Sequence, residues 1–267
     1  MSKWLVIAEK PSVALDYATA MGPYETKDKG SWYETADYII SFAVGHLLEL
    51  AEPEAYNPEW RRWSLKRLPM IPEAFKYQPR DKRAESRLKL LAKLAKKKDV
   101  TGIVNGCDAG REGEHIFRTV FEHIGSQLKA PLPVKRLWLN SMTKRAIKKG
   151  FAELMPGELY QDLAASAACR AEADWLIGMN ATRALTIRLR SRSDKTVWSA
   201  GRVQTATLAM LVRREREIRR PQVAFDELCR KMTVDYEKKR YRRRHGVSHT
   251  PSLRANAIRA MMRPVHS

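Results

Sequence analysis

The stretch IVNGCDAGREGEHIFR, residues 103–118, decides the fold that we predict for this chain. An apolar run ends at Asp108, a tight Ala109-Gly110 turn follows, and the residues from Arg111 onward are typical of a helix. An acid placed between the carboxyl end of a strand and the start of a helix lies where open α/β sheets bind their ligands. The stretch therefore predicts an α/β fold with a polar site at the ends of its strands.

The acids of this stretch allow two interpretations. Asp108 and Glu112 are four residues apart across the turn, and Mg²⁺ in proteins usually takes one or two carboxylates together with phosphate oxygens. Alternatively, Asp108 caps the helix, and Glu112 and Glu114 complement its dipole. Glu114 could also help to hold the metal, but we expect it to be a residue of the helix surface. A second acidic strand end in the segment LVIAEKPS, which contains Glu9 and Lys10, favours the metal-binding interpretation.

The pair Glu9-Lys10 suits phosphate chemistry. The acid can hold a metal or move a proton, and the amine can neutralise a phosphate oxygen. The alternative for Lys10 is an ordinary solvated lysine. His46 follows a glycine at the end of another predicted strand, and it is either a structural histidine or a contact for a phosphate.

The charge balance indicates a polyanionic partner. The chain has 50 Lys and Arg against 30 Asp and Glu, a formal net charge of +20 and a pI near 10.1, and such an excess is typical of proteins that bind nucleic acid or an anionic membrane surface. No stretch approaches the roughly eighteen apolar residues of a membrane span, so no membrane partner is expected. The three isolated cysteines predict neither a disulfide framework nor a zinc site, and they fit a reducing cytoplasm.

Strand and helix signals alternate up to about residue 155. They predict strands at 4–8, 32–43, 101–107 and 131–139, and helices at 12–21, 82–98, 111–123 and 143–154. Such alternation is typical of a mainly parallel sheet. Residues 51–80 are rich in Pro, Trp and Arg and are predicted to form a long loop, which either binds single-stranded nucleic acid by stacking or is held in place by buried tryptophans.

The chain changes character after Gly157. Residues 159–189 are Ala-rich and helical without a strand signal, and 199–218 predict another helix. The start of that second helix, beside Arg202 and Gln204, offers free backbone N–H groups for a phosphate; capping by Ser199 is the alternative.

The last segment, residues 219–267, holds 13 Lys and Arg against 4 Asp and Glu. Its apolar periodicity is weak, so we predict a basic tail without regular structure. Such a tail can hold nucleic acid by charge alone.

Four motifs, in this order, resemble those of type IA DNA topoisomerases of the topoisomerase III kind. They are LVIAEKPSVA, FAVGHLLELAEPEAYNP, DAGREGEHIFR, and DWLIGMNATRALT followed by WSAGRVQTATLAMLVRREREI. The resemblance covers about residues 3–218. It implies a toprim domain at 1–155, with a mainly parallel sheet flanked by helices, part of a central all-helical domain at 156–218, and the basic tail at 219–267.

The resemblance also implies roles for individual residues. Mg²⁺ would be held by Glu9, Asp108 and Glu112, and Glu9, Lys10 and Arg111 would act at the scissile phosphate. The positions that match a groove for single-stranded DNA are His46, Trp63, Arg170, Asp174, Arg183, Ser199, Arg202 and Gln204.

Two departures from the family pattern affect the expected chemistry. Many toprim proteins carry DxDxE, whereas Gly110 replaces the middle acid here, which implies a single, weakly held metal with waters in its shell. Family members cleave DNA with a tyrosine in a motif resembling RTDSRY, and the sequence contains no such motif; Tyr236 and Tyr241 lie in the basic tail without a supporting pattern. We therefore expect a truncated or frame-shifted chain that binds DNA without relaxing it.

The function implied by the resemblance is single-strand DNA cleavage, strand passage and religation with Mg²⁺. A non-catalytic module that holds single-stranded DNA is one alternative. Another is a different toprim chemistry, such as that of a primase or a nuclease, although the helical motifs after residue 157 argue against it. The expected partner is single-stranded or negatively supercoiled DNA, and the expected location is the cytoplasm, with the nucleoid or a plasmid.

Overall fold

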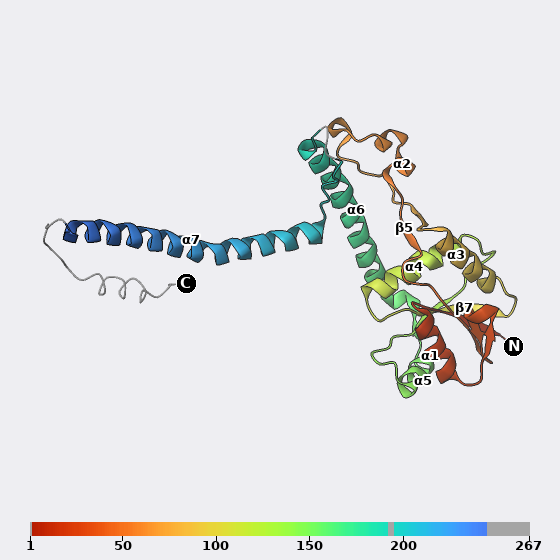
Figure 1. Ribbon diagram of the computed structural model, residues 1–267. Helices are drawn as coiled ribbons and strands as arrows, with labels where there is room; N and C mark the ends of the chain where they lie inside the picture. Colours follow the sequence, from red (N-terminus) through yellow and green to blue (C-terminus); the bar gives the residue numbers. More distant parts are fainter. Residues whose placement is uncertain (1, 192–194, 245–267) are drawn as a thin grey trace. The chain divides into compact units, whose positions relative to one another are not determined.

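The computed structural model describes residues 2–191 and 195–244 (Figure 1). The chain divides into two compact units, Met1–Arg202 and Val203–Ser267. The first unit contains the sheet and the candidate site.

Seven strands form one sheet in the order β2-β3-β4-β1-β7-β8-β9. Its four central strands are parallel: β4 (Tyr38–Phe42), β1 (Lys3–Ala8), β7 (Val100–Gly106) and β8 (Val134–Arg136). Antiparallel strands complete the two edges: β2 (Glu25–Lys27) and β3 (Trp32–Glu34) on one side, and β9 (Met155–Pro156) on the other. The predicted mainly parallel sheet is therefore confirmed.

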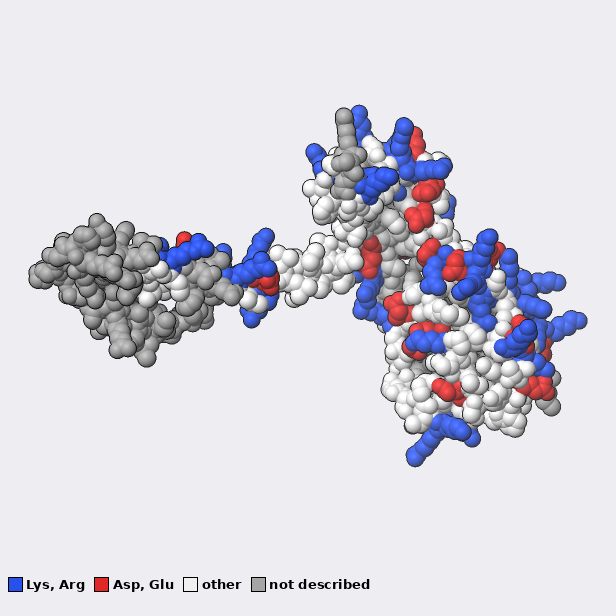
Figure 2. All heavy atoms as spheres, in the orientation of Figure 1, with Lys and Arg blue, Asp and Glu red and all other residues white. Residues whose placement is uncertain are grey.

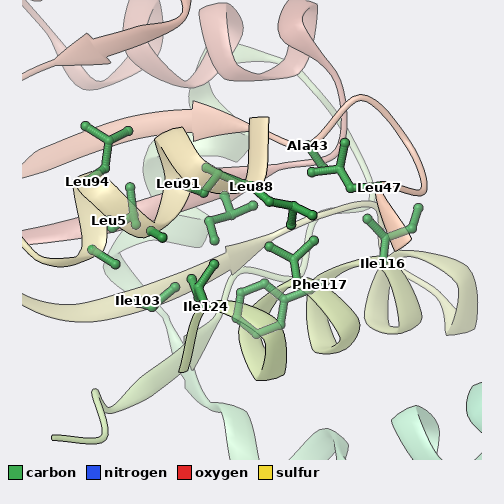
Figure 3. Packing of buried hydrophobic residues seen from close by; sticks show 14 of the residues in the cluster. Leu5, Ala43, Leu47, Leu88, Leu91, Leu94, Ile103, Ile116, Phe117 and Ile124 are labelled. Atoms are coloured by element: carbon green, nitrogen blue, oxygen red, sulfur yellow. The ribbon is translucent and has the colours of Figure 1, made fainter. Parts of the chain in front are cut away.

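Helices cover both faces of this sheet. α3 (Lys82–Ala95) and α4 (Arg111–Gly125) pack on one face, and α1 (Pro11–Met21) and α5 (Lys144–Ala152) pack on the other. Because successive side chains of a strand point to opposite faces, Leu5 and Ile7 of β1 join the first layer while Val6 and Ala8 join the second. Figure 3 shows the first layer, where Leu88 and Leu91 of α3 lie close to Phe117 of α4.

The segment 51–80, predicted as a long loop, contains short regular elements. β5 (Leu48–Leu50) and β6 (Tyr77–Pro79) form a two-stranded sheet at its ends, and α2 (Pro53–Tyr56) and the 3₁₀ turns Pro58–Arg61 and Leu65–Arg67 lie between them. Each turn is capped locally: the Asn57 side chain accepts a hydrogen bond from the Glu59 amide at 2.9 Å, and Ser64 accepts one from the Lys66 amide at 3.3 Å. One-turn elements carry no apolar period, and the sequence pattern therefore does not reveal them.

α6 (Gln161–Leu189) is one long helix that packs against α4 and also holds the segment 51–80 in place. The indole N–H of Trp175 donates to the Ala51 carbonyl at 3.0 Å. The Asn180 amide accepts from the Met70 backbone N–H at 2.6 Å and donates to the Met70 carbonyl at 3.0 Å. Both contacts bind the segment 51–80 to one face of α6.

The helix α7 (Arg202–Arg244) enters the second unit and extends well beyond the predicted end at residue 218. The prediction that the chain lacks regular structure from residue 219 is wrong for 219–244. These residues are rich in Arg and Lys, which favour a helix even without an apolar stripe. The rest of the predicted tail, 245–267, and the side chains of Tyr236 and Tyr241 lie outside what the structure describes.

Among the helices of the described residues, none has the length and apolar content needed to cross a membrane.

The three cysteines are predicted to differ sharply in reactivity. Cys107 is buried beside the end of β7, and burial raises the pKa of its thiol, so little thiolate forms. Cys169 and Cys229 are exposed. A thiol titration of the native chain with Ellman's reagent should label Cys169 and Cys229 within minutes and Cys107 only after denaturation. Rapid labelling of Cys107 in the native chain would contradict its burial beside β7.

Candidate metal and nucleic-acid site

Glu9 and Asp108 come together because of the strand order. Ala8, the last residue of β1, pairs with Gly106, the last residue of β7. β1 has β4 on one side and β7 on the other, so the direction of strand succession reverses between β1 and β7. Ligands of open α/β sheets bind at such a switch point, outside the carboxyl ends of the strands.

Lys10 connects the two acids. Its Nζ lies 3.0 Å from Glu9 Oε1 and 3.1 Å from Asp108 Oδ2. The Glu9 side chain is mostly buried, whereas those of Lys10 and Asp108 are each 54% exposed. Hydrogen bonds to Glu9 first and to Asp108 second raise the pKa of Lys10, so the ammonium stays protonated at neutral pH and within reach of solvent.

His46 reaches the site through an extension of β4. The Ala43 amide donates to the Ala8 carbonyl at 2.8 Å, and the Gly45 amide donates to the Glu9 carbonyl at 3.1 Å. Gly45 has a φ of +68°, a conformation that glycine adopts without strain. The chain then turns so that His46 Nε2 lies 2.5 Å from Glu112 Oε1 at the start of α4.

The three predicted metal ligands are therefore not gathered at one point. Glu9 and Asp108 share Lys10, whereas Glu112 faces His46. Within the described ranges, no group of three or more His, Cys, Asp or Glu side chains is arranged to hold a metal ion.

Two of the predicted ligands nevertheless fit a hard cation. The Lys10 ammonium lies within hydrogen-bond distance of both Glu9 and Asp108, so the two carboxylates already converge on one positive charge. Mg²⁺ typically takes one or two carboxylates and completes its shell with waters and phosphate oxygens. The Glu9–Asp108 pair matches that requirement.

The turn that carries Asp108 rests on a buried arginine. Arg136, 1% exposed, extends from β8 under the end of β7. Its Nη1 donates to the carbonyl oxygens of Asn105, Cys107 and Leu137 at 3.0, 2.7 and 3.0 Å, and its Nη2 donates to the Asp108 carbonyl at 2.8 Å. One guanidinium thus fixes the backbone on both sides of Cys107.

Glu114 balances the charge of Arg136. It is 1% exposed, so the expectation of a surface helix residue is wrong. Its Oε2 lies 3.2 Å from Arg136 Nε, at an angle too bent for a hydrogen bond, and accepts one from Asn105 Nδ2 at 2.8 Å. Burial raises the pKa of Glu114 and lowers that of Arg136, and the attraction between the two charges opposes both shifts.

A cleft of about 480 Å³ separates this edge of the sheet from α6. His46 and Glu112 lie on its sheet side, and Arg170 and Asp174 lie on its α6 side. A second hollow of about 390 Å³ shares Asp174 with the first and continues along α6. The second hollow also contains Trp63 and Arg183, two of the predicted DNA-contacting residues, and the first contains Arg80.

The structure gives the predicted DNA-contacting residues of α6 different environments. Asp174 forms ion pairs with Arg170 at 3.8 Å and with Arg202 at 2.7 Å, and all three are partly exposed. Arg183 is only 6% exposed, and its guanidinium binds the Trp60 carbonyl oxygen and the Met70 sulfur. Arg183 thus holds the segment 51–80 against α6 in this structure.

The remaining predicted residues are exposed. Trp63 is 42% exposed, with the Arg183 guanidinium 5.1 Å from its ring centre. Arg111 begins α4, and Ser199 precedes α7 by three residues. Gln204 lies on α7 in the second unit.

The sequence analysis did not identify four residues whose hydrogen bonds hold the site and the segment 51–80 in place: Asn105, Arg136, Trp175 and Asn180. The only available signal was Arg136, a basic residue inside the predicted strand 131–139. A charge in a strand that is covered on both faces requires a buried partner, and Glu114 is that partner here.

A sheet of this order, with acids leaving β1 and β7 at the switch point, defines a toprim domain. Residues 4–142 match the family model for the toprim domain, and residues 158–249 match the family model for DNA topoisomerase. The second match extends past Ile218, where we expected the resemblance to end.

The relatives agree with the family models. DNA topoisomerase 3 of Bacillus cereus is 45% identical over 220 residues, which is 82% of this chain and 28% of that protein. DNA topoisomerase 3 of Bacillus subtilis is 44% identical over 219 residues, with the same shares of the two chains. The chain belongs to the type IA DNA topoisomerases of the topoisomerase III kind, and it spans about 28% of the length of these curated relatives.

Proposed function

We propose that this chain binds single-stranded DNA in the cleft between the toprim domain and α6, with one phosphate at Glu9, Lys10 and Asp108. The observation that carries the proposal is the Lys10 ammonium, which is half exposed and lies between two carboxylates. The Glu9 backbone binds Gly45, next to His46, and His46 and Arg170 line the neighbouring cleft. A lysine ammonium binds phosphate as a point charge.

The acids at this edge would repel a phosphate if nothing balanced them. Lys10 balances part of the charge of Glu9 and Asp108, and a Mg²⁺ ion bound to these two carboxylates would polarise the phosphate and neutralise its charge. Glu112 is held by His46 and can join only if that pair opens. Arg136 keeps Asp108 in place throughout, because it binds backbone and not substrate.

The cleft residues would orient the strand. Trp63 offers an exposed ring on which a base can stack, and Arg170 offers donors to a neighbouring phosphate. Asp174 forms ion pairs with both Arg170 and Arg202, so it restrains the orientation of the two guanidinium groups. Arg111 at the start of α4 is the remaining candidate for the scissile phosphate.

We further propose that the 267-residue polypeptide by itself does not cut DNA. Covalent cleavage needs a nucleophile, and the sequence contains no motif resembling RTDSRY. Cleavage, strand passage and religation would require a tyrosine from outside these 267 residues. Binding to single-stranded or negatively supercoiled DNA would place the chain in the cytoplasm with the nucleoid or a plasmid.

The test uses the purified chain with end-labelled single-stranded DNA and with a negatively supercoiled plasmid, both with Mg²⁺. We expect salt-sensitive retention of the oligonucleotide in a native gel, no covalent adduct in a denaturing gel and no ladder of relaxed plasmid. An adduct would show that a tyrosine of this chain is a nucleophile and would overturn the second proposal. A failure to retain the oligonucleotide at low salt would overturn the first.

Replacing Lys10 should separate two roles of its ammonium: neutralising Glu9 and Asp108 in place of a metal ion, and binding a DNA phosphate. In Lys10→Gln the ammonium no longer competes with a divalent cation for Glu9 and Asp108, so Mg²⁺ affinity should rise several-fold in a calorimetric titration, while oligonucleotide affinity measured without Mg²⁺ should fall. Asp108→Asn should lower Mg²⁺ affinity instead. The control is Glu25→Gln, which changes an exposed carboxylate of β2 and should alter neither. A lower Mg²⁺ affinity in Lys10→Gln would contradict this interpretation of the site.

A further inference from the structure

The outer face of α3 carries a dense row of basic side chains that the proposed site does not use. Residues 82–98 contain eight Lys and Arg against one acid, Glu85. Leu88, Leu91 and Leu94 of α3 point into the core, and six of the eight basic residues are exposed; the other two, Arg87 and Lys97, are half-buried. In Figure 2 the Lys and Arg atoms gather in the region where Figure 1 places α3.

Four of these lysines follow the helix axis on one side. Lys82, Lys89, Lys93 and Lys96 are exposed and separated by seven, four and three residues, which keeps them near one face of a helix. At about 1.5 Å per residue they span about 21 Å. One strand of duplex DNA presents a phosphate about every 3.4 Å along the axis, so the row can follow about six phosphates. We call these four lysines the α3 ridge.

The α3 ridge is largely free of acidic partners. Lys89 pairs with Glu85 at 2.6 Å, and for Lys82, Lys93 and Lys96 the described residues include no acid within ion-pair distance. α3 also contains no aromatic residue. α3 itself therefore offers no ring on which a base of single-stranded DNA could stack, in contrast to the cleft with Trp63. Unpaired lysines without rings fit the phosphate backbone of a duplex.

The α3 ridge begins beside the cleft. Arg80 lines the cleft, Asp81 caps α3 by accepting a hydrogen bond from the Ala84 amide at 2.8 Å, and Lys82 is the first residue of the helix. Basic residues therefore continue from the cleft onto the outer face of the toprim domain.

We propose that the α3 ridge is a second DNA-contact surface, which binds the backbone of duplex DNA next to the single strand held in the cleft. The proposal rests on the proposed function, because it takes DNA as the partner, and it adds the form of DNA and the residues that hold it. Lysine ammonium groups that contact phosphates make no contacts with base edges, so we expect binding to be independent of the DNA sequence.

The test compares two variants of the full chain that lose the same charge. The first is Lys82→Gln/Lys89→Gln/Lys93→Gln/Lys96→Gln. The matched control is Lys144→Gln/Arg145→Gln/Lys148→Gln/Lys149→Gln on α5, which covers the other face of the sheet. Both sets are exposed, both helices keep their caps Asp81 and Thr143, and Gln has nearly the helix propensity of Lys. Circular dichroism checks that each variant is folded.

Fluorescence anisotropy then measures the affinity for a blunt duplex of about 20 base pairs and for an oligothymidine of equal length, at several NaCl concentrations. Loss of the α3 ridge should weaken duplex binding about tenfold or more at low salt and reduce the salt slope by about 0.9 per lost phosphate contact, or about 3 to 4 in all. Oligothymidine affinity should change less than about twofold. The α5 control should keep both affinities. Lys93→Gln/Lys96→Gln should give about half the change in slope.

Three results would overturn the proposal: an unchanged duplex slope, equal losses in the α3 and α5 variants, or equal losses for duplex and oligothymidine. Binding to phosphatidylserine vesicles tests the alternative that the α3 ridge contacts an anionic membrane surface. If the α3 variant loses vesicle binding but keeps duplex binding, the ridge is a membrane surface and the proposal fails. Failure of the unaltered chain to bind oligothymidine overturns the proposed cleft function alone, because duplex binding is measured separately.

Discussion

Arg136→Ala is expected to cost about 3 to 5 kcal/mol of unfolding free energy, because it leaves the buried Glu114 carboxylate with only the more distant Arg118, at 3.8 Å, as an ion-pair partner. The change also removes the four backbone hydrogen bonds that the guanidinium donates around Cys107. Urea denaturation followed by circular dichroism measures the loss. A cost below about 1 kcal/mol would mean that the pair behaves like one at the protein surface.

Two further variants isolate the cause. Arg136→Met/Glu114→Gln removes both charges and keeps most of the volume, so it should recover much of the lost stability. Lys89→Ala breaks an exposed ion pair of 2.6 Å on α3 and should cost less than about 1 kcal/mol. The comparison shows whether burial, and not the ion pair as such, sets the size of the effect.

Arg136→Lys tests the positioning role apart from stability. An ammonium keeps the charge opposite Glu114, but it cannot reach the four carbonyls that the planar guanidinium binds. Where this variant is folded, the Asp108 turn should be looser and Mg²⁺ affinity lower than in the unaltered chain.

The approach of Glu9 to Asp108 could be predicted because most of it follows from local patterns. Each acid follows an apolar run, each run is a strand, and parallel strands bring their carboxyl ends to the same edge. The helices on both faces follow in the same way from their apolar periodicity. Three-dimensional pairing adds only that β1 and β7 are neighbours.

The parts that could not be predicted depend on contacts between distant segments. Glu114 can be buried because Arg136 of β8 lies beside it, and no pattern near Glu114 in the sequence indicates that partner. Arg183 is buried because the segment 51–80 folds back on α6, although that segment has no period to show it. Glu112 faces His46 instead of Glu9 because the turn at Gly45 directs the chain there.

The helix beyond residue 218 escapes prediction for a different reason. Apolar periodicity identifies helices that pack on a core, whereas Arg, Lys and Glu favour a helix through their unbranched side chains. Residues 219–244 of α7 lack the first property and have the second, so a prediction from periodicity alone assigns them to a tail without regular structure.

Gly113→Ala is expected to destabilise the chain by about 1 to 3 kcal/mol and to lower its Mg²⁺ affinity sharply. An alanine Cβ at this position would overlap the carbonyl oxygen of Asp108 and would lie 2.9 Å from its backbone nitrogen. Since the clash is with backbone, no side chain can rotate away from it. Either α4 or the Asp108 turn must move, which separates Asp108 from Glu9.

Glycine-to-alanine substitutions at the two ends of α4 separate the steric clash at Gly113 from the entropic gain that alanine ordinarily gives in a helix. Replacing a helical glycine by alanine ordinarily gains about 0.5 to 1 kcal/mol through backbone entropy. Gly125 is at the other end of α4, and an alanine Cβ there would meet no atom within 4 Å, so Gly125→Ala should show that gain alone. Gly110→Ala, at the N-cap of α4 with equally open surroundings, should stay within about 0.5 kcal/mol and keep Mg²⁺ binding. If Gly113→Ala behaves like either control in urea denaturation and Mg²⁺ titration, the close contact between α4 and the Asp108 turn does not govern the site.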